Sequence, residues 1–202
     1  MIDILGQLGA GSDLIEHHIG AITAVIAGAA VFQWRETRLT AERQLRAYVL
    51  NSSATLFDGT TMPHAFVDRA GQAGVILTIK NYGQPPAYAV CHEAEIQVAP
   101  VCNEGRMSIP RDQHPRSAFT LGPDGSSNSF RWLNRPISPQ EQAGIVAGTV
   151  AIYAYGRVEY TDAFKRRRWS TYRLRHCGNA WPPVGGSESI GMDFCAEGND
   201  GN

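Results

Sequence analysis

The feature that most constrains this chain is an uncharged run of sixteen residues, Ile19–Trp34, with the sequence IGAITAVIAGAAVFQW. Its only polar side chains are Thr23 and Gln33, and it is followed directly by the arginines Arg35, Arg38, Arg43 and Arg46. An apolar run beside basic residues is typical of a membrane helix. We therefore predict one helix over residues 14–46, apolar in its first half, charged in its second, and capped by Asp13.

The run is short for a membrane-spanning helix. At 1.5 Å per residue it rises about 24 Å, against a hydrocarbon core of about 30 Å, and snorkelling of Arg35 closes part of that difference. Two other interpretations stay open. A buried helix of a soluble domain can carry a short apolar run. A cleaved signal peptide also has one, although basic residues normally come before it and none precedes Ile19 here.

The distribution of basic residues predicts the side of the membrane. Lys and Arg are absent before Ile19, whereas arginines follow Trp34 closely. Because the positive-inside rule keeps basic flanks in the cytoplasm, we predict a single-pass protein of the cell's inner membrane with a cytoplasmic β domain. In that reducing compartment Cys91, Cys102 and Cys177 are expected to be free thiols.

Small residues recur along the apolar run at a spacing of four, at Gly20, Ala24 and Gly28. A stripe of small residues lets two membrane helices approach closely, so these positions form a candidate helix-pairing face that would produce a homodimer. An alanine-rich run also produces this spacing by chance, and that interpretation stays open.

After residue 46 the hydrophobic period changes from that of a helix to that of strands. Alternating or extended segments predict strands over residues 47–57, 75–82, 87–98, 149–160 and 166–177, with a turn at Asp58-Gly59 and a short helix capped by Ser138. Short strands joined by turns, without a βαβ rhythm, predict an antiparallel β-sandwich over residues 47–181. We expect residues 1–13 to be a short leading segment and residues 182–202, rich in Gly and acids, to be a flexible tail.

Alternation within these strands predicts which side chains face the core. In the strand at 87–98 the expected inner side chains are Tyr88, Val90, Ala94, Ile96 and Val98, and the expected outer ones are Cys91, Glu93, Glu95 and Gln97. In the strand at 149–160 one face carries Val150, Ile152, Ala154, Val158 and Tyr160, and the other carries Tyr153 and Tyr155.

Three segments of the chain resemble a group of uncharacterised bacterial proteins built from one N-terminal membrane helix and a small immunoglobulin-like domain. They are residues 46–49 (RAYV), 81–87 (NYGQPPA) and 156–164 (GRVEYTDAF). The resemblance covers the chain from about Ile19 to Cys177, and its motifs are structural rather than catalytic. It implies a mainly β, immunoglobulin-like antiparallel sandwich after one long helix. It implies no activity.

No motif for catalysis or for a cofactor is found. The sequence has no Gly-x-Ser-x-Gly elbow, no phosphate loop and no His-Glu-x-x-His, and Glu93 and Glu95 on one strand face are expected to be solvated. The candidate metal ligands are Cys91-His92, Cys102, His114 and His176-Cys177, but adjacent strand residues point to opposite faces. We therefore predict no catalytic, cofactor or metal site.

The most distinctive charged feature is the basic segment around residues 165–175. Arg167, Trp169, Arg173 and Arg175 alternate onto one strand face, which we expect to be exposed. Arginines interleaved with an exposed Trp can hold phosphates of anionic lipid or, less favourably, of nucleic acid. The alternative is a charged soluble hairpin whose arginines discourage edge pairing.

These patterns predict a single-pass, membrane-anchored β-sandwich that acts as an interaction or accessory module without catalytic activity. Its partners would be the lipid bilayer, a protein of unspecified kind and a second copy through the helix. The alternative is a membrane-surface sensor that binds anionic lipid or nucleic acid through the Arg167–Arg175 face. A third class, an enzyme, would require a cleft with convergent polar groups.

Overall fold

The computed structural model describes residues 3–58, 72–101, 107, 117–178 and 190–202, with side chains from Gly20 onward except at 21 and 43. The elements in chain order are α1 (Asp3–Gln44), β1 (Val49–Asp58), β2 (Gln72–Asn81), β3 (Ala87–Pro100), β4 (Phe119–Leu121), β5 (Ser126–Pro136), α2 (Pro139–Val146), β6 (Val150–Thr161), β7 (Arg167–His176), β8 (Ile190–Gly191) and β9 (Asp193–Phe194). The chain divides into two compact units, Met1–Leu45 and Arg46–Asn202.

The helix α1 is longer than predicted. The expected start at Leu14 after an Asp13 cap is wrong, because α1 begins at Asp3. Residues 3–13 contain no proline, and the leucines and alanine among them favour continued helix. In the charged half of α1, Arg38 Nε lies 3.3 Å from Glu42 Oε1 and forms the ion pair expected of residues four apart in a helix.

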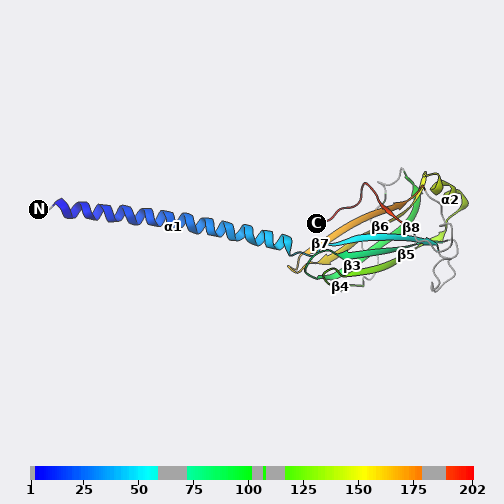
Figure 1. Ribbon diagram of the computed structural model, residues 1–202, viewed down its shortest axis with the longest axis horizontal. Coiled ribbons are helices and arrows are strands. Elements are labelled where there is room, and N and C mark those ends of the chain that lie inside the picture. The colour runs from blue at the N-terminus through cyan, green and yellow to red at the C-terminus, as the bar shows by residue number, and fades with distance from the viewer. Residues whose placement is uncertain (1–2, 59–71, 102–106, 108–116, 179–189) are drawn as a thin grey trace. The chain divides into compact units, whose positions relative to one another are not determined.

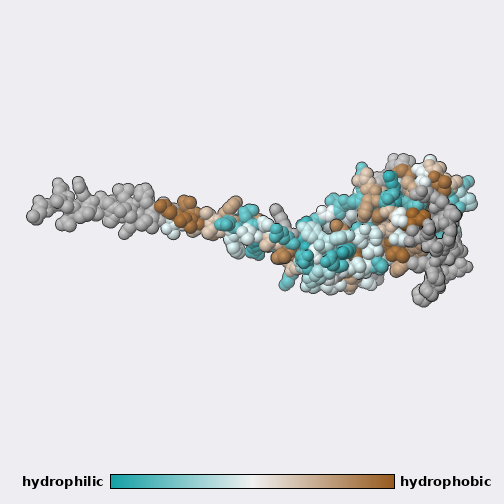
Figure 2. Space-filling model, in the orientation of Figure 1, coloured by the Kyte–Doolittle hydropathy of each residue, from teal (hydrophilic) through white to brown (hydrophobic). Residues whose placement is uncertain are grey.

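Among the described side chains of α1, six large apolar ones have exposed fractions between 60% and 71%: Ile22, Val25, Ile26, Val31, Phe32 and Trp34. Figure 2 shows a brown, hydrophobic band on this part of the helix. Among the described residues, no helical stretch is long and apolar enough to cross a bilayer. The membrane helix therefore stays a prediction.

The second unit consists of two antiparallel sheets (Figure 1). One sheet has the strand order β5-β2-β1-β8, and the other has the order β4-β3-β6-β7-β9. The central hairpin β6–β7 is continuous from Ile152, opposite His176, to Thr161, opposite Arg167. This arrangement confirms the predicted mainly β, sandwich-like fold of antiparallel strands.

The main apolar core lies between the two sheets. It combines side chains of β1 and β2 with side chains of β3, β6 and β7, among them Leu56, Leu77, Ile79, Val90, Ile152, Val158 and Leu174. The inner side chains predicted for β6 all contribute to this core, so the alternation there is confirmed. On β3 the prediction fails at Tyr88, which is 45% exposed, because the register shifts between Tyr88 and Cys91 and Ala89 adopts a φ of 49°.

A second, smaller apolar cluster covers part of the outer face of β6. Tyr153 and Tyr155 pack there with Ala99, Ala151, Met107 and Cys195. Cys195 belongs to the expected flexible tail, and that expectation is wrong for residues 190–202. β8 pairs with β1 and β9 with β7, so the C-terminal segment joins both sheets.

Two further elements were not predicted from the sequence. β4 and β5 lie where no strand was predicted, and β5 is an edge strand whose residues are mostly polar or partly exposed. The helix α2 is capped as predicted, since Ser138 and Glu141 form a reciprocal capping box. The structure describes Asp58 but not Gly59, so the turn expected there lies outside the described residues. Cys102, His114 and residues 182–189 lie outside them as well.

Candidate anion-binding site

The turn between β6 and β7 is built around the buried carboxylate of Asp162. Its Oδ1 accepts hydrogen bonds from the backbone amides of Phe164 and Arg166, each at 2.9 Å, and its Oδ2 accepts one from Arg168 Nε at 2.9 Å. Burial alone would raise the pKa of Asp162, but these donors together lower it below its usual value. The carboxylate therefore stays ionised and fixes the start of β7.

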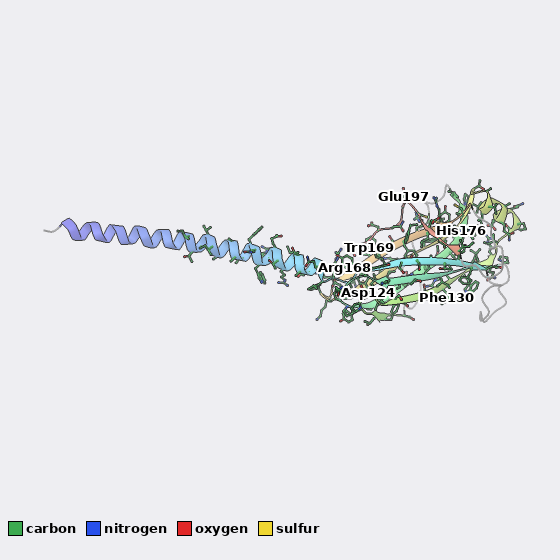
Figure 3. The ribbon with its side chains drawn as sticks, viewed as in Figure 1. Asp124, Phe130, Arg168, Trp169, His176 and Glu197 are labelled. Atoms are coloured by element: carbon green, nitrogen blue, oxygen red, sulfur yellow. The ribbon has the colours of Figure 1, made fainter. Side chains whose placement is uncertain are left out.

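An open cleft of about 460 Å³ lies beside this turn, on the outer face of the five-stranded sheet. Its basic side chains are Arg157, Arg167 and Arg168, and its other lining residues are Ala89, Cys91, Glu159, Tyr160, Thr161 and Trp169. Figure 3 shows Arg168 and Trp169 at the same end of the sandwich as Asp124, away from His176 and Phe130.

The geometry of the cleft favours a small anion. Arg157 Nε donates to Glu159 Oε1 at 2.7 Å, and its guanidinium carbon lies 4.6 Å from the centre of the Trp169 ring. The exposed side chain of Arg167 has no hydrogen bond or ion pair within the described part of the chain. Arg157 is paired with Glu159 and Arg168 with Asp162, so Arg167 adds a net positive charge to the cleft, and its planar guanidinium is suited to phosphate or carboxylate.

The structure brings together only half of the basic face predicted from the sequence. Arg167 and Trp169 line the cleft, but Arg173 is only 5% exposed, so its placement on a solvent face is wrong. Its Nη2 donates to the carbonyl of Met107 at 3.1 Å, and the backbone at Gly198 packs against its guanidinium. Arg175 lies opposite Tyr153, beyond Arg173 along β7. The C-terminal segment thus separates Arg175 from the cleft residues.

The arrangement offers no obvious nucleophile and base pair in the cleft. The Cys91 thiol lines it and lies 3.6 Å from the carbonyl oxygen of Ala89. A nucleophilic thiol is usually activated by a neighbouring general base, and none of the lining residues is a histidine. The adjacent His92 faces the opposite side of β3, as the alternation predicted.

His92 belongs to a buried polar chain that sequence reasoning missed. Its Nε2 lies 2.6 Å from the Tyr172 hydroxyl, and its Nδ1 lies 3.0 Å from Ser129 Oγ. Burial, and then the charge of Arg131, lower the pKa of His92 to about 4, so the ring is a poor base at neutral pH. The chain links β5, β3 and β7, and its role is therefore to join the two sheets. The only signal in the sequence was the inward position of His92 in the alternation of β3.

The remaining candidate residues are not brought together. The described residues contain no cluster of three His, Cys, Asp or Glu side chains suited to a metal ion. On α1, a Cβ atom added at Gly20 or at Gly28 would meet no heavy atom within 4 Å, and Ala24 is exposed. The helix-pairing face is therefore open in the single chain, and pairing stays a prediction.

Comparison with known proteins yields no match for this chain, either among family models, among curated proteins or among solved structures. The class of the protein is therefore the one that the fold itself defines. It is a mainly β protein with two antiparallel sheets in a sandwich-like arrangement and one N-terminal helix.

Proposed function

We propose that the protein is a single-pass membrane protein whose immunoglobulin-like β-sandwich works as an interaction or accessory module without catalytic activity. The bilayer is its first partner, and a protein that binds the sandwich is its second. The basic flank after the apolar run favours a cytoplasmic sandwich at the inner membrane.

One observation carries this proposal: the large apolar side chains between Ile22 and Trp34 are exposed on all sides of α1. At 100° per residue, Ile22, Phe32 and Trp34 point in widely different directions. A groove on a soluble partner covers one face of a helix, whereas a bilayer covers every face. Lipid is therefore the environment that satisfies this run best.

The proposal is tested by washing membranes with alkaline carbonate, and we expect the wild-type chain to stay with the membrane fraction. Ala24→Arg combined with Ala27→Arg should release it, since each charge near the helix centre costs about 2.5–3.5 kcal/mol against a marginal gain of insertion. Thr37→Arg combined with Ala41→Arg adds the same charge to the polar half and should leave the chain bound. Retention of the Ala24 and Ala27 double variant, or release of the wild type, would contradict membrane anchoring.

The cleft supports a second candidate, the recognition of anionic lipid or nucleic acid through the basic hairpin. Its site is smaller than the predicted Arg167–Arg175 face, because Arg173 is buried. What supports it is the convergence of Arg157, Arg167 and Trp169 on one cleft. Exposed arginines stacked on aromatic rings hold phosphates well.

A further inference from the structure

The end of the sandwich beside the cleft is formed by three turns, at residues 81–87, 122–125 and 162–166; we call it the docking end. The buried side chain of Asn81 fixes the first two turns. Its Oδ1 accepts from the amides of Tyr48 and Gly83, at 3.1 and 2.9 Å. Its Nδ2 donates to the carbonyl of Pro85 at 2.8 Å and to the carbonyls of Leu121 and Gly122 at 3.3 and 3.2 Å. The third turn is fixed by Asp162, so all three are rigid.

These turns and the adjoining strand ends display aromatic and basic side chains to solvent. Tyr82 is 52% exposed, Tyr88 45% and Phe164 38%. Lys165, Arg166 and Arg167 follow Phe164 and are exposed as well. The bilayer interface favours aromatic rings beside basic groups.

Acidic groups at the docking end do not cancel this positive charge. Within the three turns the acids are Asp124 and Asp162. Asp162 is buried against Arg168, and Asp124 lies 3.3 Å from Lys80. The surface therefore presents a net positive charge, which suits an anionic lipid headgroup layer.

The docking end is also where the chain enters the sandwich. The Tyr160 hydroxyl donates to the carbonyl of Ala47 at 3.0 Å, so the first residues of the second unit lie at this end. α1 stops at Gln44, and the two residues between it and Ala47 span about 10 Å at most. If the hydrocarbon core of the bilayer ends near Trp34, the ten residues from Trp34 to Gln44 extend the helix about 15 Å further. The headgroup layer accounts for about 5–8 Å of that length. The docking end is therefore the part of the sandwich that follows α1 most directly along the chain.

We infer that the docking end binds the surface of an anionic bilayer, with Lys165, Arg166 and Arg167 at the phosphates and with Phe164, Tyr82 and Tyr88 in the interfacial layer. This inference rests on the proposed function for the presence of the bilayer. The remaining gap between Gln44 and the headgroups is about one Debye length at physiological ionic strength, so the attraction acts across it.

The test uses the fragment of residues 46–202, which contains both sheets and both apolar clusters within one compact unit. We expect it to float with vesicles of phosphatidylcholine and phosphatidylglycerol, to bind phosphatidylcholine alone weakly, and to lose binding as salt rises. Lys165→Asn with Arg166→Ser should weaken partitioning about fivefold for each charge, hence about twenty-fivefold together. Asn suits the positive φ of 62° at Lys165, so the turn should be preserved.

Phe164→Ser with Tyr82→Ser should also reduce binding, whereas Phe130→Ser, which changes a comparably exposed aromatic in the middle of β5 and outside the docking end, should not. Thermal melting of each variant separates lost binding from lost folding. Equal binding to both kinds of vesicle, or an unchanged affinity of the charge and aromatic variants, would overturn the inference. Tight binding of single-stranded DNA with no vesicle binding would also overturn it, as would competition by inorganic phosphate at the concentration of the lipid phosphate. Because the fragment lacks α1, these results are independent of the carbonate test of the anchor.

Discussion

Gly156→Ala is expected to destabilise the sandwich by about 3 kcal/mol, at the upper end of the cost of overpacking a core. A Cβ atom at Gly156 would collide with the backbone carbonyl of Glu93 and with the hydroxyl of Tyr172. The first obstacle is backbone of the paired strand β3, and the second is a fully buried side chain held by His92. Neither can move away without breaking hydrogen bonds, so strain or strand separation must result.

The measurement is a thermal or urea melt of the fragment of residues 46–202. For a domain of this size we expect a Tm lower by about 6–12 °C. Gly191→Ala is the matched control, because a Cβ atom there meets no atom within 4 Å, and it should change the Tm little. Equal melting of the Gly156 variant and wild type would show that β3 and β6 do not pack as described.

Acidification from pH 6.5 to pH 4 is expected to cost the sandwich about 3 kcal/mol through His92 alone. Burial, and then the Arg131 charge, lower the pKa of His92 from 6.5 to about 4. In that window the unfolded chain binds the proton and the folded protein does not, so acid favours unfolding. Lowering the pKa of His92 from 6.5 to about 4 corresponds to about 3 kcal/mol of unfolding free energy. Tyr172 and Ser129, which face the ring, are uncharged here, and burial of His176 adds a loss in the same direction.

Urea unfolding at a series of pH values measures this loss. His92→Gln keeps a hydrogen-bonding side chain but cannot titrate, so its unfolding free energy should vary much less between pH 6.5 and 4. Glu141 interferes little in this window, because the guanidinium of Arg135, more than any other neighbour, lowers its pKa to about 2, and most of that stabilisation is lost below pH 4. An equally steep pH dependence in the His92 variant would contradict the role given to His92.

The strands that were predicted correctly are those whose pattern reflects burial between the sheets. In β6, inner and outer side chains alternate without interruption, and both faces are packed, one against each apolar cluster. Alternation assigned Arg173 correctly to the outer face of β7 but could not show that this face is covered there. Its burial depends on Met107 and the backbone at Gly198, which lie far from β7 in sequence.

The C-terminal segment escaped prediction because it pairs with the sheet mainly through irregular contacts. The side-chain oxygens of Asn199 and Asn202 accept hydrogen bonds from the amides of Arg173 and Trp169, in place of a regular strand. A Gly-rich acidic composition gives no sign of such pairing. The sequence predicted the basic segment but not the docking end as a whole. The three turns of the docking end come from distant segments, which the buried Asn81 and the register of the sheets bring together.

The central claim is that α1 anchors the sandwich on the cytoplasmic side of the inner membrane. The most direct measurement labels carbonate-washed membrane vesicles of both orientations with a membrane-impermeant maleimide. The reporter is Cys91, a partly exposed thiol that lines the cleft, and Cys91→Ser is the control. We predict labelling of Cys91 in inside-out vesicles without prior reduction and none in right-side-out vesicles. Labelling of right-side-out vesicles, or the absence of the protein from the washed membranes, would contradict the account.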